Sequence, residues 1–350
     1  IGINTMNLGG DHLKMRKILF YPSGDRELPS SHLRVYETAK ELEARGVSVT
    51  IVDPKMTNES KKVYLDLAEP GTTVYVQKIA QLFHKAESFA PYKGKHRIVY
   101  DVDDYHEGKD NLMIETADLV VAGSHYVMNY CRQFNREVHL ACSITDTDVY
   151  RYVDRSEKPA NAPINIIWTE SFANAYLDDL SLIEKPMRKM HEKYNIRFIL
   201  QGLRENRHIP NPRYQNLMAN FIRMFPYCII QKFMPIDQFL TKGAQVIKDA
   251  DIGAIPFKPD RVGKAAQNMR SLMATGLGVI GTPGNEHEYV IAHGETGFLA
   301  TTEGEWEQAL ETLITNRKLR LEMGQKASKH ILNTYGREQY MKQIVAILGF

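Results

Sequence analysis

The stretch GKAAQNMRSLMATG, residues 263–276, combines polar groups with a helical periodicity that could bring them into one site. At 100° per residue its apolar side chains fall on one face, while Lys264, Asn268 and Ser271 fall on the other. The pattern therefore predicts a helix that starts at Lys264 and stops at Gly276. Exposed N–H groups and the positive end of a helix dipole, beside a lysine ammonium, suit a diphosphate. From periodicity alone, a solvated polar face is the commoner outcome, because most amphipathic helices bind no ligand.

Two other predicted strand ends carry groups that could contact phosphate. Thr169 and Ser171 follow a strand that reaches Trp168, and their hydroxyls could either bind phosphate or cap the next helix. Gly202 ends a later strand of the same predicted sheet, and Arg204 beside it could be a second phosphate cation. The basic loop around Arg204 is explained more simply as a solvated loop.

The elements that would position these groups alternate between strands and helices in two runs. In the first run, strands are predicted at residues 18–21, 47–52, 73–76, 97–100, 119–122 and 138–141. The polar segment 154–163 contains two prolines and predicts a linker. In the second run, strands are predicted at residues 164–168, 197–200, 228–231, 252–255, 279–280 and 298–299. Two doubly wound α/β domains follow from this alternation, with a ligand cleft at the carboxyl ends of their strands.

Composition limits the classes of protein. A length of 350 residues accommodates two such domains, and the formal net charge of +2 argues against extensive nucleic-acid binding. The three cysteines show no CxxC spacing, so we expect neither a disulfide framework nor a zinc site. Such sparse cysteines are typical of a reducing compartment, so we expect a cytoplasmic location. No apolar run reaches the length of a membrane-spanning helix, about 18 residues or more. Residues 1–14 have the character of an expression leader, and the natural chain is expected to open at Met15.

Several short segments carry a resemblance to a known family. They follow one another in the family's order: Pro256-Phe257, Gly263-Lys264, Met273-Ala274-Thr275-Gly276, Val279-Ile280 and the loop at 294–300. Together they resemble the donor-site signature of retaining GT-B glycosyltransferases, the large "glycosyl transferases group 1" family that includes sucrose synthases. Phe233-Met234 is similar to that family's base-contacting loop. In the first half, segments 100–104 and 117–121 resemble a bacterial or phage branch more loosely.

The chain departs from the family pattern at two acidic positions. Family members carry two glutamates, in positions that Gly263 and Ser271 occupy here. The resemblance assigns those glutamates to the hydroxyl groups of the donor, so their loss leaves the identity of the donor open. Glu288 or Asp260 could substitute. A descendant that has lost catalysis is an alternative.

An acidic cluster, Asp101-Val102-Asp103-Asp104, ends a predicted strand of the first domain. It could hold magnesium or manganese through oxygen ligands, cap the next helix or bind an acceptor. The resemblance favours a metal-independent enzyme, so we expect no metal and place Asp101 and Asp104 on the acceptor side. His106 could face the same cleft, although a lone histidine is more often structural. Gly24, after the first strand, would let substrates approach the backbone.

The resemblance implies a hexosyltransferase that needs no cofactor. It would move a sugar from a UDP- or GDP-linked donor to an acceptor hydroxyl with retention of configuration. Lys264 and Arg204 would stabilise the leaving phosphate. The acceptor stays open among glycan, lipid-linked sugar, protein, wall polymer and modified DNA base. A GT-B nucleotide-sugar epimerase and a non-catalytic binding protein are the rival functions.

The expected organisation has an acceptor-side domain over residues 15–158 and a donor domain over residues 159–335. Residues 336–350 show helical spacing of apolar side chains. In the family that they resemble, the corresponding helix returns to pack on the first domain.

Overall fold

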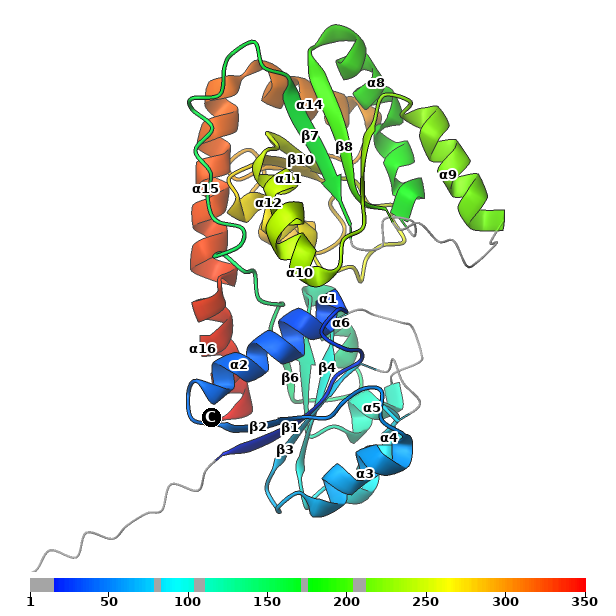
Figure 1. Cartoon of the computed structure of the whole chain (residues 1–350), viewed down its shortest axis with the longest axis vertical. Helices are drawn as coiled ribbons and strands as arrows, with labels where there is room; N and C mark the ends of the chain where they lie inside the picture. The colour runs from blue at the N-terminus through cyan, green and yellow to red at the C-terminus, as the bar shows by residue number, and fades with distance from the viewer. Residues whose placement is uncertain (1–15, 79–82, 104–110, 171–175, 204–211) are drawn as a thin grey trace, which may run out of the picture.

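The computed structural model describes residues 16–78, 83–103, 111–170, 176–203 and 212–350. In this part of the chain two α/β domains lie one above the other along the longest axis (Figure 1). Each domain is built on a six-stranded sheet whose neighbouring strands all run parallel. The predicted fold class, two doubly wound parallel sheets, is therefore confirmed.

The first sheet has the order β2-β1-β3-β4-β5-β6. Its strands are β1 (Lys17–Tyr21), β2 (Ser48–Ile51), β3 (Thr73–Gln77), β4 (Arg97–Val102), β5 (Leu119–Ala122) and β6 (Val138–Leu140). Its helical elements are α1 (Pro29–Ser31), the π-turn η1 (His32–Tyr36), α2 (Glu37–Glu43), α3 (Asn58–Leu67), α4 (Ala86–Phe89), the 3-10 turn η2 (Ala90–Tyr92), α5 (Asn111–Thr116) and α6 (His125–Cys131). Strand β5 is buried along its whole length, which explains why its sequence is an apolar run rather than an alternating pattern.

The second sheet has the order β12-β11-β10-β7-β8-β9. Its strands are β7 (Ile164–Thr169), β8 (Ile196–Leu203), β9 (Ile229–Lys232), β10 (Ile252–Ile255), β11 (Gly278–Gly281) and β12 (Phe298–Leu299). Its helical elements are the 3-10 helix η3 (Leu177–Ile183), α8 (Glu184–Lys193), α9 (Pro212–Met224), α10 (Ile236–Gln238), the π-turn η4 (Phe239–Gly243), α11 (Ala244–Lys248), α12 (Gln267–Ala274), α13 (His287–Val290) and α14 (Glu303–Thr315).

The last two helices connect the domains. Helix α15 (Arg317–Tyr335) packs on the second domain, and α16 (Arg337–Leu348) continues from it onto the first (Figure 1). The buried side chains of α16 join the first domain's core; they are Tyr340, Met341, Ile344 and Leu348. Arg337, the first residue of α16, forms ion pairs with Glu37 at 2.9 Å and Asp146 at 3.0 Å. The last helix is thereby fixed to the domain that begins with β1.

The polar segment 154–163 is fastened to the second domain. Tyr150, which precedes it, already belongs to that domain's core. Arg155 is 9% exposed. Besides the nearby Val153 carbonyl, its guanidinium donates to the carbonyl oxygens of Ala250 at 2.6 Å, Thr275 at 2.8 Å and Lys248 at 2.9 Å. The chain therefore joins the second domain before the predicted boundary at residue 158.

One predicted element differs in a way that matters for the site. The helix expected from Lys264 begins instead at Gln267, as α12. A turn in which the Lys264 N–H donates to the Arg261 carbonyl at 3.1 Å comes before it. Ala266, with φ −86° and ψ 32°, is not yet helical. Lys264 thus stands on the loop leading into the helix.

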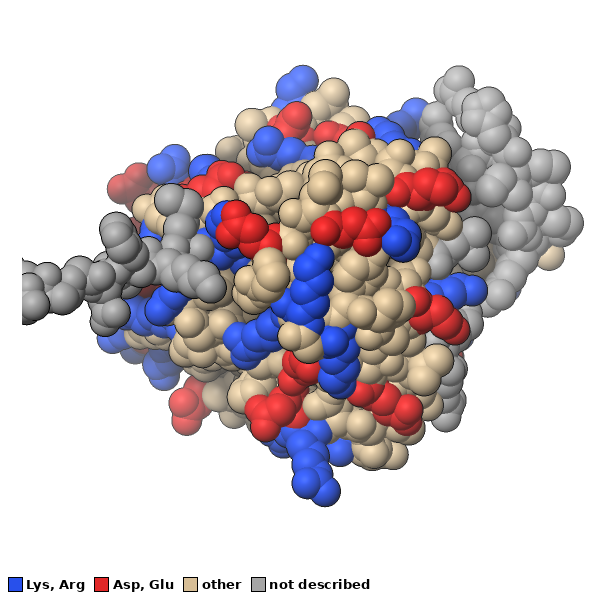
Figure 2. Space-filling view, turned by 90° about the horizontal axis from the view of Figure 1, so that it is seen from below, with Lys and Arg blue, Asp and Glu red and all other residues tan. Residues whose placement is uncertain are grey.

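The end of the first domain remote from the second carries basic and acidic side chains close together (Figure 2). Ion pairs of this domain include Lys17–Glu69 at 2.5 Å and Lys62–Asp66 at 3.0 Å. In the described part of that face, charges of both signs are interspersed, whereas a surface that binds nucleic acid is mainly positive. Among the residues that the structure describes, no helix combines the length and apolar character needed to cross a membrane.

We predict a loss of stability in acid from two buried histidines, His84 and His287. Burial lowers the pKa of each to about 4. Unfolded histidine has a pKa of about 6.5, so the unfolded state binds more protons between about pH 6.5 and 4. Lowering the pH from about 7 to 4.5 should therefore cost on the order of 2 kcal/mol of unfolding free energy per histidine. Denaturant titrations of the wild type and His287→Phe at both pH values check this. An equal loss in the two proteins would contradict the assignment to His287.

Candidate active site

A cavity lies between the two domains, with walls from both. On the second domain it is lined by seven residues singled out from the sequence: Thr169, Gly202, Phe233, Met234, Lys264, Asn268 and Ser271. These lie at or just after the carboxyl ends of β7, β8 and β9 and on the segment entering and forming α12. This is the edge at which open parallel sheets place their ligands. Residues separated by about a hundred positions are thus brought into one site.

Lys264 extends from its loop into this cavity. Its Nζ lies 3.4 Å from the Glu170 carboxylate and 3.1 Å from the Tyr176 hydroxyl. The ammonium also stands 4.2 Å from the centre of the Tyr176 ring, a cation–π contact. Because an ammonium has three N–H donors, Lys264 can keep one such partner and still donate to an oxyanion in the cavity.

Glu170, directly after β7, is the acidic group of this wall. It is 3% exposed, and its Oε2 accepts a hydrogen bond from the Asn268 amide at 2.9 Å. Gly202 allows the two strand ends to approach. Its φ is +103°, and a Cβ at this position would lie 1.8 Å from the Glu170 carbonyl oxygen. Glycine is therefore required at residue 202 both by the backbone conformation and by the space.

The loop that carries Lys264 is anchored to η3 by charge. Asp178 forms ion pairs with Lys258 at 3.1 Å and Arg261 at 3.3 Å. Asp179, which is fully buried, accepts the Lys258 N–H at 3.2 Å, and burial raises its pKa to about 6. The Arg261 guanidinium stacks over Tyr176 at 5.1 Å. These contacts explain why residues 258–264 form a turn instead of an extra helical segment.

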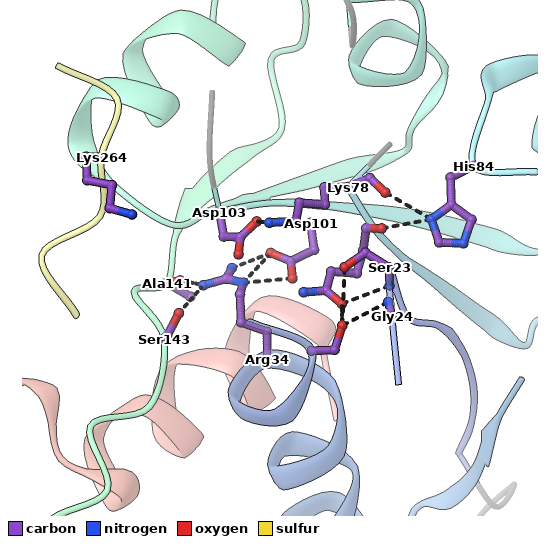
Figure 3. A network of polar contacts seen from close by, with 12 residues as sticks. Ser23, Gly24, Arg34, Lys78, His84, Asp101, Asp103, Ala141, Ser143 and Lys264 are labelled. Atoms are coloured by element: carbon purple, nitrogen blue, oxygen red, sulfur yellow. Dashed lines mark hydrogen bonds and ion pairs between the residues drawn. The ribbon is translucent and has the colours of Figure 1, made fainter. Parts of the chain in front are cut away.

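An ion pair of the first domain forms part of the wall of the same cavity. Lys78 and Asp103, which follow β3 and β4, line it and form an ion pair at 2.9 Å. Figure 3 shows Lys264 pointing from its loop toward Asp103 and the neighbouring Arg34–Asp101 pair. Glu27 reaches across the cleft, because its Oε2 accepts the backbone N–H of Ile236 at 3.0 Å.

Asp101 does not line this cavity, in contrast to the acceptor-side role expected for it. It is fully buried and held by Arg34, whose Nε lies 2.9 and 2.8 Å from its two carboxylate oxygens. Arg34 also donates to the Ala141 carbonyl at 3.0 Å and the Ser143 hydroxyl at 3.2 Å. Burial alone would lower the pKa of Arg34, but attraction to Asp101 raises it well above its ordinary value. Asp101 is a structural partner that ties η1 to β4.

Two further predicted residues are placed away from the cavity. Glu288 is exposed on α13, and the neighbouring Glu286 is buried instead, with its carboxylate accepting the His125 N–H at 2.9 Å. Glu286 is the N-cap residue of α13 and Glu288 lies within the helix, so the two side chains point in different directions, which the sequence alone did not reveal. Gly24 also lies outside the lining, and its N–H donates to the Ser31 hydroxyl at 3.1 Å.

Ser171, Arg204, Asp104 and His106 lie outside the described residues. Within the described part of the chain, no group of three His, Cys, Asp or Glu side chains is arranged to hold a metal ion.

Sequence reasoning missed four of the site residues described above: Glu170, Tyr176, Lys78 and Glu27. Glu170 stood between two residues that were singled out, and its signal was an acidic side chain directly after an apolar strand. Tyr176 and Lys78 had no local signal, because only the tertiary structure brings them beside Lys264 and Asp103.

No family model and no curated protein sequence matches the chain. Solved structures do match it. Sucrose-phosphate synthase from Thermosynechococcus elongatus superposes with a TM-score of 0.72 at 12% identity, over 96% of this chain and 98% of its own. HepE from Anabaena, solved in complex with UDP and glucose, gives 0.70 at 14% identity over 96% and 99%. A glycosyltransferase from Rickettsia africae gives 0.70 at 14% over 96% and 99%. The chain therefore has the GT-B fold, two Rossmann-like domains that face each other across a cleft.

Proposed function

We propose that the protein is a glycosyltransferase that holds a UDP- or GDP-linked sugar in the interdomain cavity and transfers the sugar to an acceptor hydroxyl. The observation that carries this proposal is the position of Lys264, inside the cavity, beside the start of α12 and at the carboxyl edge of the second sheet. An ammonium and helix N–H groups at such an edge suit a diphosphate. The UDP and glucose found with HepE, which has the same fold, support this proposal.

The residues would assist the reaction by stabilising charge. The bond between the anomeric carbon and the β-phosphate oxygen breaks, and a bond from that carbon to the acceptor oxygen forms. Lys264 would stabilise the charge that develops on the phosphate, and Arg204 would be a second cation. The acceptor proton would pass to the leaving phosphate. Transfer with retention of the anomeric configuration would then need no separate general base. Phe233 and Met234, which also line the cavity, would contact the nucleotide base.

We expect the reaction to proceed without a metal ion. Of the acidic cluster at the end of β4, Asp101 is bound to Arg34 and Asp103 to Lys78, so both carboxylates already have cationic partners. Turnover with excess EDTA should stay within about twofold of the untreated rate, since Lys264 does the work of a cation. Loss of activity with EDTA and its recovery with manganese or magnesium would show that this is wrong.

Incubation of the purified protein with a panel of labelled UDP- and GDP-sugars, with and without a mixture of glycan and lipid acceptors, tests the function. The proposal predicts acceptor-dependent release of the nucleoside diphosphate. Conversion of the donor sugar without any acceptor would identify the rival epimerase. No conversion, together with tight donor binding, would identify a binding protein.

A further inference from the structure

The buried carboxylate of Glu170 has no role yet in the chemistry above. It lines the cavity with Lys264, Asn268 and Ser271, and it is joined to the first two by contacts of 3.4 and 2.9 Å. A carboxylate in a diphosphate site weakens anion binding, because it offsets the charge of the lysine. We therefore expect Glu170 to interact favourably with another part of the ligand, which would offset the weaker binding of the diphosphate.

The position of Glu170 is rigid. Its N–H donates to the Gln201 carbonyl at 3.1 Å, and its own carbonyl oxygen packs against Gly202. The Asn268 amide fixes the carboxylate from α12. The backbone of Glu170 is thus held by β8 and its carboxylate by α12, and a residue fixed in this way is suited to recognising a specific group.

Geometry limits which part of the donor Glu170 can meet. A phosphate bound by Lys264 would lie within a few ångströms of the Glu170 carboxylate, since the ammonium and carboxylate are 3.4 Å apart. The group attached to that phosphate is the sugar to be transferred. Ionised carboxylates only accept hydrogen bonds, and sugar hydroxyls donate them. A sugar with its own carboxylate would instead bring two like charges together.

We infer, on the basis of the proposed function, that Glu170 accepts hydrogen bonds from hydroxyl groups of the donor sugar and restricts the donor to uncharged sugars. It supplies a specificity-determining carboxylate where Gly263 and Ser271 provide none. The uronic-acid donors are the class that it excludes.

Calorimetric titrations of UDP, UDP-glucose and UDP-glucuronate test this, with GDP, GDP-mannose and GDP-mannuronate as the parallel series. The proteins are the wild type, Glu170→Gln and the control Glu192→Gln, whose substituted side chain is exposed on α8. The wild type and the control should prefer the neutral donor over the uronate by about tenfold or more. Glu170→Gln should lose most of this preference. It should bind the nucleoside diphosphate alone at least as tightly as the wild type, because Lys264 then has no carboxylate beside it.

The outcomes separate the inference from the function. An unchanged preference in Glu170→Gln, or a wild type that prefers the uronate, would overturn the role of Glu170 and leave the glycosyltransferase proposal intact. A wild type that binds neither nucleotide series would contradict the proposed function itself. Thermal unfolding of Glu170→Gln shows whether the variant is folded, and the ratio of affinities within one folded protein does not depend on its stability.

Discussion

Replacing Lys264 by alanine should lower turnover of the true donor by about 10²-fold or more, since one preorganised charge contact to a developing oxyanion contributes about 3–4 kcal/mol. The side chain is a fifth exposed and stands on a loop, so its loss should leave the fold in place. Release of nucleoside diphosphate, measured at saturating donor, gives the rate. The effect should appear mainly in kcat, because the charge on the phosphate grows in the transition state.

Lys318→Ala is the control. Lys318 is exposed on α15 and does not line the cavity. Its replacement should leave kcat within about threefold, as expected for a group outside the reacting site. Near-normal turnover by Lys264→Ala, or equal losses in the two variants, would show that Lys264 has no specific catalytic role.

The largest expected effect on stability is at Arg34. Replacing it by methionine leaves the fully buried Asp101 without its cation and should cost about 3–5 kcal/mol of unfolding free energy. It also removes the hydrogen bonds to Ala141 and Ser143, which fix the chain where it leaves the first sheet. Urea denaturation followed by circular dichroism measures the loss.

The double variant Arg34→Met/Asp101→Leu separates charge from packing. Replacing a buried ion pair by apolar side chains of similar size often restores stability, so this protein should recover most of the loss. Stability of Arg34→Met within about 1 kcal/mol of the wild type would show that the pair is not a major element of the first domain.

The two sheets were predictable because their strands are short apolar runs with local signals. Phe20 and Val74, for example, are fully buried in strands that their own sequences mark. Contacts between distant residues were not predictable. Asp101 was assigned to the cleft because nothing near it in sequence shows that Arg34, 67 positions earlier, would bury it.

The same limit applies within the site. The periodicity of 263–276 correctly grouped Lys264, Asn268 and Ser271 on one cavity, but it started the helix too early. The early start was wrong because Asp178 and Asp179 hold the preceding loop in a turn from more than 80 positions away. Glu170 meets Asn268 across 98 positions, so its place in the site appears only in the folded chain.

The most direct test of the central claim is calorimetric titration of UDP and GDP into the full chain, the variant Lys264→Ala and the control Lys318→Ala, whose lysine is exposed on α15. We expect saturable binding of one of the two nucleotides at a ratio of one to one in the wild type and the control. Binding should be about tenfold or more weaker in Lys264→Ala, as expected for the loss of a charged hydrogen bond. Absence of binding to the wild type, or equal affinity in all three proteins, would contradict the placement of a nucleotide-sugar in this cavity.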